Sequence, residues 1–167
     1  VSNQRRILTA DFAITAYRPI REDEVARVRE LLGIKREVRE VEFVTMVVND
    51  AALGGSNQGS LIEVHAVESH FPIDGEFTFS DGTKQGGGPV GDNLWVTSDA
   101  ALALGLSAEL KAGGRLKLGR VDFTIEKVIT QAPGISRGAF GMAPRVYIPI
   151  DRASLTGLTG FGSQIYH

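Results

Sequence analysis

The 167-residue chain has no cysteine, a single tryptophan and two methionines, and aromatic residues make up only 7% of it. Without cysteine it cannot form a disulfide, a cysteine-ligated zinc site or a thiol nucleophile. The missing cysteine does not assign a compartment, because secreted and cytosolic domains can both lack this residue.

An excess of one charge and long apolar runs are also missing. The formal net charge is −2, so there is no basic surplus to attract nucleic acid or an anionic membrane, and we expect no nucleic-acid partner. No apolar stretch approaches the roughly 18 residues needed to span a bilayer. The first residues have no signal-peptide pattern. We therefore expect a soluble protein, or a soluble piece of a longer one.

What is present suits a globular domain, with 43% hydrophobic and 23% charged residues. The length is sufficient for one domain or for two small subdomains. Apolar periodicity separates the expected strands from the expected helices. The expected strands are 10–16, 41–48, 61–67, 73–79, 94–96, 115–118, 121–125, 145–150 and the beginning of one at 163–167. The expected helices are 22–32, 99–104 and a single turn at 151–155. This order predicts an α+β fold.

Several local signals set the boundaries of these elements. Gly33 is suited to end the first helix, whose apolar stripe begins at Val25 and continues to Leu31 and Leu32. Ser98 is suited to cap the second helix. Gly119-Arg120 predicts a type II′ hairpin turn. Segment 41–48 is apolar at most positions on both faces, so we expect a buried strand that pairs with 61–67 in a hairpin.

A hydrolase motif is spelled by Gly134, Ser136 and Gly138. The nucleophile elbow of such enzymes needs a strand, a sharp turn and a helix around the serine, with a histidine base nearby. Pro133 and Pro144 leave no room for the helix. Asp151 and His167 follow in the right order, but His167 is the last residue printed, a poor position for a preorganised base. We expect a glycine-rich loop here.

A dinucleotide-like spacing occurs at Gly86, Gly88 and Gly91. A pyrophosphate site would need a helix N-terminus immediately afterwards. Pro89 interrupts the motif and a strand is expected to follow it. A flexible surface loop is the better interpretation.

Four potential metal ligands lie close together in sequence: Glu63, His65, Glu68 and His70. Glu63 and His65 share one face of the expected strand, which makes two ligands conceivable. The spacing matches no known zinc motif, and we expect instead the solvent-facing side of a half-buried hairpin, which would look the same in the sequence. We therefore assign no metal, cofactor or catalytic residue.

In the loop further on, the apolar Phe140 and Met142 are candidates either for partner or lipid contact or for capping the core.

Taken together, the segments resemble the extracytoplasmic, MacB-like periplasmic core domain of FtsX-like ABC transporter permeases, especially YbbP-type permeases with a large first periplasmic loop. The order and spacing of plain structural segments carry the resemblance, which extends over nearly the whole chain. These segments are 8–14, 41–48, 61–68, 70–75, 94–96, 101–106, 114–119, 123–125 and 144–150.

The resemblance implies a single truncated domain, 1–167, with a porter-like α/β part at 7–79 plus 145–167 and an inserted β-rich subdomain at 90–144. It implies no catalytic residue and no cofactor. The implied location is the periplasmic side of the bacterial inner membrane. The implied partners are a cytoplasmic ATPase subunit, reached through the full-length permease, and a periplasmic protein or a lipid- or lipoprotein-like substrate. Two alternatives stay open: a small serine hydrolase using Ser136, and a free-standing β-rich module that binds a glycan or peptide.

Overall fold

A computed structural model of the chain describes residues 15–16, 20–48, 59–106, 114–133, 144–159 and 164–166. These residues form a mixed sheet of ten strands with three α-helices and one 3-10 turn. The strands are β1 Thr15–Ala16, β2 Glu40–Val48, β3 Gly59–Val67, β4 Phe77–Phe79, β5 Lys84–Gln85, β6 Asn93–Thr97, β7 Arg115–Leu118, β8 Val121–Gln131, β9 Arg145–Pro149 and β10 Gln164–Tyr166. The helices are α1 Glu22–Leu32, α2 Ser98–Ala103 and α3 Ile150–Ala153, and the 3-10 turn is η3 Ser154–Thr156.

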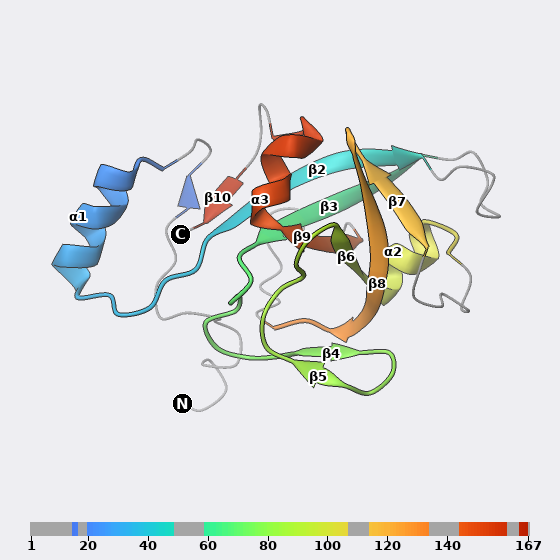
Figure 1. The fold of residues 1–167 in the computed structure, drawn as a ribbon, viewed down its shortest axis with the longest axis horizontal. Helices are drawn as coiled ribbons and strands as arrows, with labels where there is room; N and C mark the ends of the chain where they lie inside the picture. The colour runs from blue at the N-terminus through green and yellow to red at the C-terminus, as the bar shows by residue number, and fades with distance from the viewer. Residues whose placement is uncertain are drawn as a thin grey trace.

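One sheet runs through the described part of the chain, in the strand order β1-β10-β2-β3-β9-β6-β8-β4-β5, with β7 paired to β8 (Figure 1). Most neighbours are antiparallel, but β3 pairs with β9 and β6 pairs with β8 in parallel. The α+β prediction is confirmed. Within the described ranges, no helix is both long and apolar enough to cross a membrane.

The predicted hairpin is confirmed, because β2 and β3 pair from Glu40↔Val67 to Val48↔Gly59. Its tip, 49–58, lies outside the described residues. The prediction that β2 is buried on both faces is wrong, since Met46 is 59% exposed and its cross-strand partner Leu61 is 52% exposed. In the described structure, the face that carries this pair is covered only toward the other end of the hairpin.

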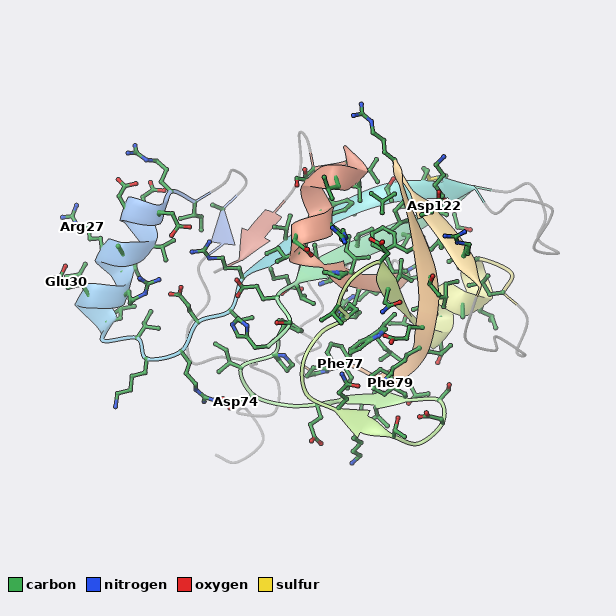
Figure 2. All side chains as sticks on the ribbon, viewed as in Figure 1. Arg27, Glu30, Asp74, Phe77, Phe79 and Asp122 are labelled. Atoms are coloured by element: carbon green, nitrogen blue, oxygen red, sulfur yellow. The ribbon has the colours of Figure 1, made fainter. Side chains whose placement is uncertain are left out.

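Side chains alternate between two apolar clusters on opposite faces of the sheet, as the pleat requires. The first cluster holds Val64 from β3 and Val96 from β6, together with Ala100 of α2 and Ala153 of α3. The second cluster is aromatic and is built from Phe71, Phe77, Phe79, Trp95 and Tyr147. Figure 2 shows Phe77 and Phe79 on the side of β4 that faces the rest of the sheet.

Helix α1 has the predicted bounds and lies at one end of the molecule (Figure 1). Gly33 ends it in the left-handed region, with φ 61°. The predicted apolar stripe is only partly buried: Val25 is 5% exposed, but Leu31 is 74% and Leu32 51% exposed. Figure 1 shows the helix apart from the middle of the sheet, and in the described structure the part of the stripe near its C-terminal end stays uncovered. Ion pairs such as Arg39–Glu22, with Nη1–Oε1 2.7 Å, link it to the segment before β2.

Several boundaries differ from the sequence prediction, and β8 alone runs six residues beyond the expected 121–125, to Gln131. The cap of α2 is Thr97 rather than Ser98, because the Thr97 hydroxyl accepts from Ala100 N at 3.3 Å. The strand expected at 73–79 is only β4, since Gly75 adopts φ 110° and breaks the extended run. A short strand, β5, lies where a loop was expected. The Gly119 turn is confirmed. A type II′ turn requires a positive φ at its first central residue only, and Gly119 has φ 57° whereas Arg120, like every other described non-glycine residue, has no positive φ.

Candidate functional site

A buried group of charged side chains lies on the face of the sheet that carries the aromatic cluster. We call it the His65 cluster, and it consists of Glu40, Glu42, Glu63, His65 and Arg145. Strand register brings these residues together: Glu42 is paired with His65 across β2 and β3, and Glu63 is paired with Arg145 across β3 and β9. Because side chains two apart share a face, Glu40 lies beside Glu42 and Glu63 lies beside His65.

The imidazole of His65 is held between three carboxylates. Its Nδ1 lies 2.5 Å from Glu40 Oε1 and 3.3 Å from Glu42 Oε1, and its Nε2 lies 2.6 Å from Glu63 Oε1. Arg145 Nε approaches the same Glu63 oxygen at 3.3 Å. Since a carboxylate only accepts hydrogen bonds, both ring nitrogens donate and the imidazole is a cation.

The pKa values of the cluster follow from this geometry. Burial alone would lower the pKa of His65, but the hydrogen bond and charge of Glu40, with those of Glu63 and Glu42, outweigh it and raise the pKa to about 9. Burial would raise the pKa of Glu63, but His65 and Arg145 hold it below its usual range. Near pH 7 the cluster therefore consists of a protonated His65 paired with ionised carboxylates. His65 is not a neutral base that could accept a proton.

Aromatic packing closes one side of the cluster. The ring of Tyr147 lies 5.1 Å from that of His65, and its phenol is buried, which raises the pKa of Tyr147 well above its usual value. The Tyr147 ring packs edge-to-face against Phe77, with 5.1 Å between ring centroids. Phe77 packs in the same way against Trp95, at 5.2 Å. The charged group therefore lies against the aromatic cluster and is shielded from water on that side.

The predicted metal-ligating residues divide into two pairs. Glu63 and His65 share a face as expected, but the prediction that this face is turned to solvent is wrong, because the two residues are 2% and 4% exposed. Glu68 and His70 form a separate surface pair, with Oε2–Nε2 3.3 Å and 61% of the His70 side chain exposed. The Glu68 carboxylate also accepts from Arg39 N at 2.9 Å.

Sequence reasoning did not find Glu40, Glu42, Arg145 or Tyr147 as members of this site. A signal for the first two was present, since acidic residues alternate in 40–42 just as Glu63 and His65 alternate in the returning strand. Whether Glu40 and Glu42 lie opposite His65 depends on the register of the hairpin. The sequence of the connecting loop does not predict that register. Arg145 and Tyr147 come from β9, far away in sequence, and only the parallel pairing with β3 brings them close.

The two motif-like sites have different outcomes. Strand β6, not a helix, follows Gly86, Gly88 and Gly91, so the described structure provides no pyrophosphate-binding helix N-terminus there. The interpretation of this segment as a surface loop is confirmed for Gly86 and Gly91, which are exposed, but is wrong for Gly88, which is buried and donates from its backbone N to Ser69 O at 3.0 Å. An added Cβ at Gly88 would lie 2.7 Å from Val67 Cγ2. Gly88 therefore permits close packing of its backbone against Val67 and Glu68.

Ser136, Phe140, Met142 and His167 lie outside the described residues, so the hydrolase motif and the apolar loop stay predictions. Asp151, the expected acid of that motif, is a surface side chain of α3 and lies 3.8 Å from Arg152 Nη1. In the part of the chain that the structure describes, the hydrogen bonds of both imidazoles go to carboxylates or to the Glu37 carbonyl rather than to a serine.

A small cavity of about 180 Å³ lies beside the middle of β8. It opens where β8 has passed β7 and has not yet reached β4, and it is lined by Phe79, Asp81, Glu126 and Lys127 among others. Lys127 Nζ lies 4.3 Å from the centre of the Phe79 ring and 2.6 Å from Gln85 Oε1, so its charge is already satisfied within the protein. The cavity is smaller than an ordinary ligand site.

The fold defines the class of the molecule: an α+β domain built on one mixed sheet. In particular, it is similar to the crystal structure of the extracellular domain of the noncanonic ABC-type transporter YknZ from Gram-positive bacteria. The TM-score is 0.53 at 10% identity, over 87% of this chain and 71% of that chain. No family model and no curated protein matches the sequence. At this identity the similarity shows the fold alone.

Proposed function

We propose that this chain is the extracytoplasmic domain of an ABC transporter permease, without catalytic activity of its own. The observation that carries the proposal is the similarity to the extracellular domain of YknZ over 87% of the chain. The ordered segments that resemble FtsX-like permeases support the same assignment from the sequence alone. In finer terms we propose a MacB-like core domain on the periplasmic side of the membrane.

The path of the chain supports insertion between two membrane helices. The first and last described strands are neighbours: β1 pairs antiparallel with β10, and Thr15 lies opposite Tyr166. The segments before Thr15 and after Tyr166 therefore start from the same end of the same strand pair. A domain inserted between two membrane helices needs its two connections to return to one side in this way.

The proposed mechanism is mechanical coupling. The domain contacts a periplasmic partner protein or a lipid- or lipoprotein-like substrate, and its movement is linked to the membrane helices of the permease. ATP hydrolysis belongs to the cytoplasmic ATPase subunit that works with an ABC permease, and residues 1–167 contain no phosphate-binding loop of their own. The described imidazoles, bound to carboxylates and a carbonyl, support a role in structure rather than in catalysis.

The test starts with the parent gene. Its translation should contain an apolar segment of about 20 residues on each side of the region between Val1 and His167. Alkaline phosphatase inserted into the full-length protein at this domain should be active, because that enzyme folds only outside the cytoplasm, and a fluorescent-protein control for the cytoplasmic side should mark the opposite loops. A gene without flanking apolar segments, or an inactive phosphatase fusion, would overturn the proposal.

A second experiment addresses coupling. The full permease and its ATPase subunit are reconstituted in proteoliposomes, and residues 15–166 are replaced by a short flexible linker. We expect ATP hydrolysis to persist while its dependence on the transported substrate or partner disappears. Substrate-stimulated hydrolysis that is unchanged without the domain would contradict the coupling role.

A further inference from the structure

We propose that the His65 cluster binds a divalent transition-metal cation, with the carboxylates of Glu40 and Glu42 and the Nδ1 atom of His65 as its protein ligands. These three ligand atoms lie within 4.8 Å of one another. Carboxylate and imidazole donors are the set that suits Zn²⁺ and related first-row ions.

The distances already approach those of a metal site. Two ligand atoms on one tetrahedral Zn²⁺ ion are separated by roughly 3.4 Å, given metal–ligand bonds of about 2.1 Å. His65 Nδ1 and Glu42 Oε1 are 3.3 Å apart. Glu40 Oε1, now 2.5 Å from Nδ1, needs to retreat by less than about 1 Å to admit the ion. A rotation of the Glu40 side chain suffices, and the backbone of β2 and β3 stays in place.

The other nitrogen of the imidazole is held as metal-binding histidines usually are. Nε2 lies 2.6 Å from Glu63 Oε1, and Arg145 Nε lies 3.3 Å from the same oxygen. A carboxylate that accepts from the second ring N–H fixes the tautomer and the ring orientation of a metal-ligating histidine. Nδ1 is thereby directed at the Glu40 and Glu42 carboxylates.

The charge of the cluster suits a cation. Among the described residues, the ion pairs of His65 and Glu63 bring three carboxylates together with one imidazole and one guanidinium. In the same part of the chain, Glu63 Oε2, on a side chain only 3% exposed, has no hydrogen-bond partner. A divalent ion that replaces the Nδ1 proton adds one positive charge beside these carboxylates, and buried carboxylates are usually paired with positive charge.

An ion can reach the site from one side. The side chains of Glu40 and Glu42 are 15% and 16% exposed, whereas that of His65 is 5% exposed. The carboxylates therefore form the outer edge and the imidazole the inner wall, with Tyr147 stacked beside the imidazole. Zn²⁺ and a proton compete for Nδ1 in this arrangement.

The experiment is a Zn²⁺ titration by calorimetry on chelator-cleaned protein at pH 7.5. The chain offers a matched pair of variants: Glu42→Gln, 3.3 Å from His65, and Glu68→Gln, 3.3 Å from the exposed His70. We expect the wild type to bind one Zn²⁺ with Kd of about 10 µM or tighter. Glu42→Gln should weaken binding at least about tenfold and Glu68→Gln should leave it unchanged.

Glu42→Gln retains the hydrogen bonds of His65 to Glu40 and Glu63, so it should fold, and circular dichroism checks this. His65→Asn serves as a second variant and should abolish binding. Two outcomes overturn the proposal. One is the absence of saturable Zn²⁺ binding by the wild type. The other is saturable binding that Glu42→Gln leaves unchanged or that Glu68→Gln weakens, because such binding belongs to the surface pair or to another site.

Discussion

His65 and His70 lie five residues apart and have opposite environments. His65 is buried among carboxylates, whereas the His70 side chain is 61% exposed and its Nε2 donates to the Glu37 carbonyl oxygen, 3.0 Å away. The difference follows from position: His65 is inside β3 and His70 is beyond its end. A buried cation of this kind makes folding depend on pH.

The first prediction concerns this pH dependence in the metal-free protein, kept so by a chelator. The pKa of His65 rises from an ordinary value of 6.5 to about 9 on folding. Because the pKa of His65 is raised, its protonation stabilises the folded state fully below pH 6.5. This contribution to the free energy of unfolding is lost as the pH rises through about 9. The free energy of unfolding, from urea denaturation, should therefore fall between these limits by an amount on the order of 3 kcal/mol. His70→Gln should retain the fall, and a wild-type profile that stays flat from pH 7 to 9 would contradict it.

The second prediction concerns two glycines with similar backbone angles and different surroundings. Gly119 has φ +57° and an added Cβ would lie 2.0 Å from the Thr156 carbonyl oxygen, whereas Gly91 has φ +68° and open space. Gly91→Ala should cost about 1 kcal/mol from backbone strain alone. Gly119→Ala should cost roughly 3 kcal/mol or more, because the β7–β8 turn must also leave η3. Urea denaturation measures both, and equal costs would show that the turn contact contributes nothing.

At the scale of elements, the sequence predicted most segments and misplaced several boundaries. The β2–β3 and β7–β8 hairpins follow from alternation and turn chemistry, which are local. Which side chains of β8 lie on which face of the sheet does not follow from local patterns. Its register with β6 shifts between Leu94↔Ile125 and Trp95↔Lys127, so Ile125 belongs to the first cluster and Ile129 to the second although both have odd numbers. Such a bulge depends on tertiary packing and has no plain sequence signal.

The third prediction tests the corrected cap of α2. The Thr97 hydroxyl accepts from Ala100 N at 3.3 Å and from Arg145 N at 3.2 Å, and donates to the Arg145 carbonyl at 3.0 Å. Ser98 Oγ makes one contact, to Ile129 O at 3.2 Å. Thr97→Ala should therefore destabilise by about 2 kcal/mol and Ser98→Ala by about 1 kcal/mol. Thermal unfolding of both variants decides, and a larger loss for Ser98→Ala would restore the cap expected from the sequence.

At the scale of the whole molecule, the strand order is what the sequence could not provide. Neighbours such as β10 beside β2 and β9 between β3 and β6 join segments that are distant in the chain. The same long-range pairing, between β3 and β9, brings Arg145 and Tyr147 to the His65 cluster, so that part of the site was equally hidden. The α+β class could be predicted because it depends only on the order of strands and helices along the chain, which local patterns reveal.

The last prediction concerns whether the proposed porter-like and β-rich parts unfold separately. Strands β6 and β9 join them through Trp95↔Tyr147 and Val96↔Val146, and both clusters draw side chains from both strands. We expect one cooperative unit. Ile62→Ala, in the first cluster, should cost about 2–5 kcal/mol.

The single tryptophan makes this measurable, because Trp95 lies in the second cluster, on the other face and in the other proposed part. In the Ile62→Ala variant, the urea midpoints from Trp95 fluorescence and from far-UV circular dichroism should shift together. Leu102→Ala is the control. That side chain is 82% exposed on α2, so the free energy of unfolding from both signals should stay within about 0.5 kcal/mol of wild type. A dichroism midpoint that shifts while the fluorescence midpoint does not would mean two independent units, which could then move relative to each other during transport.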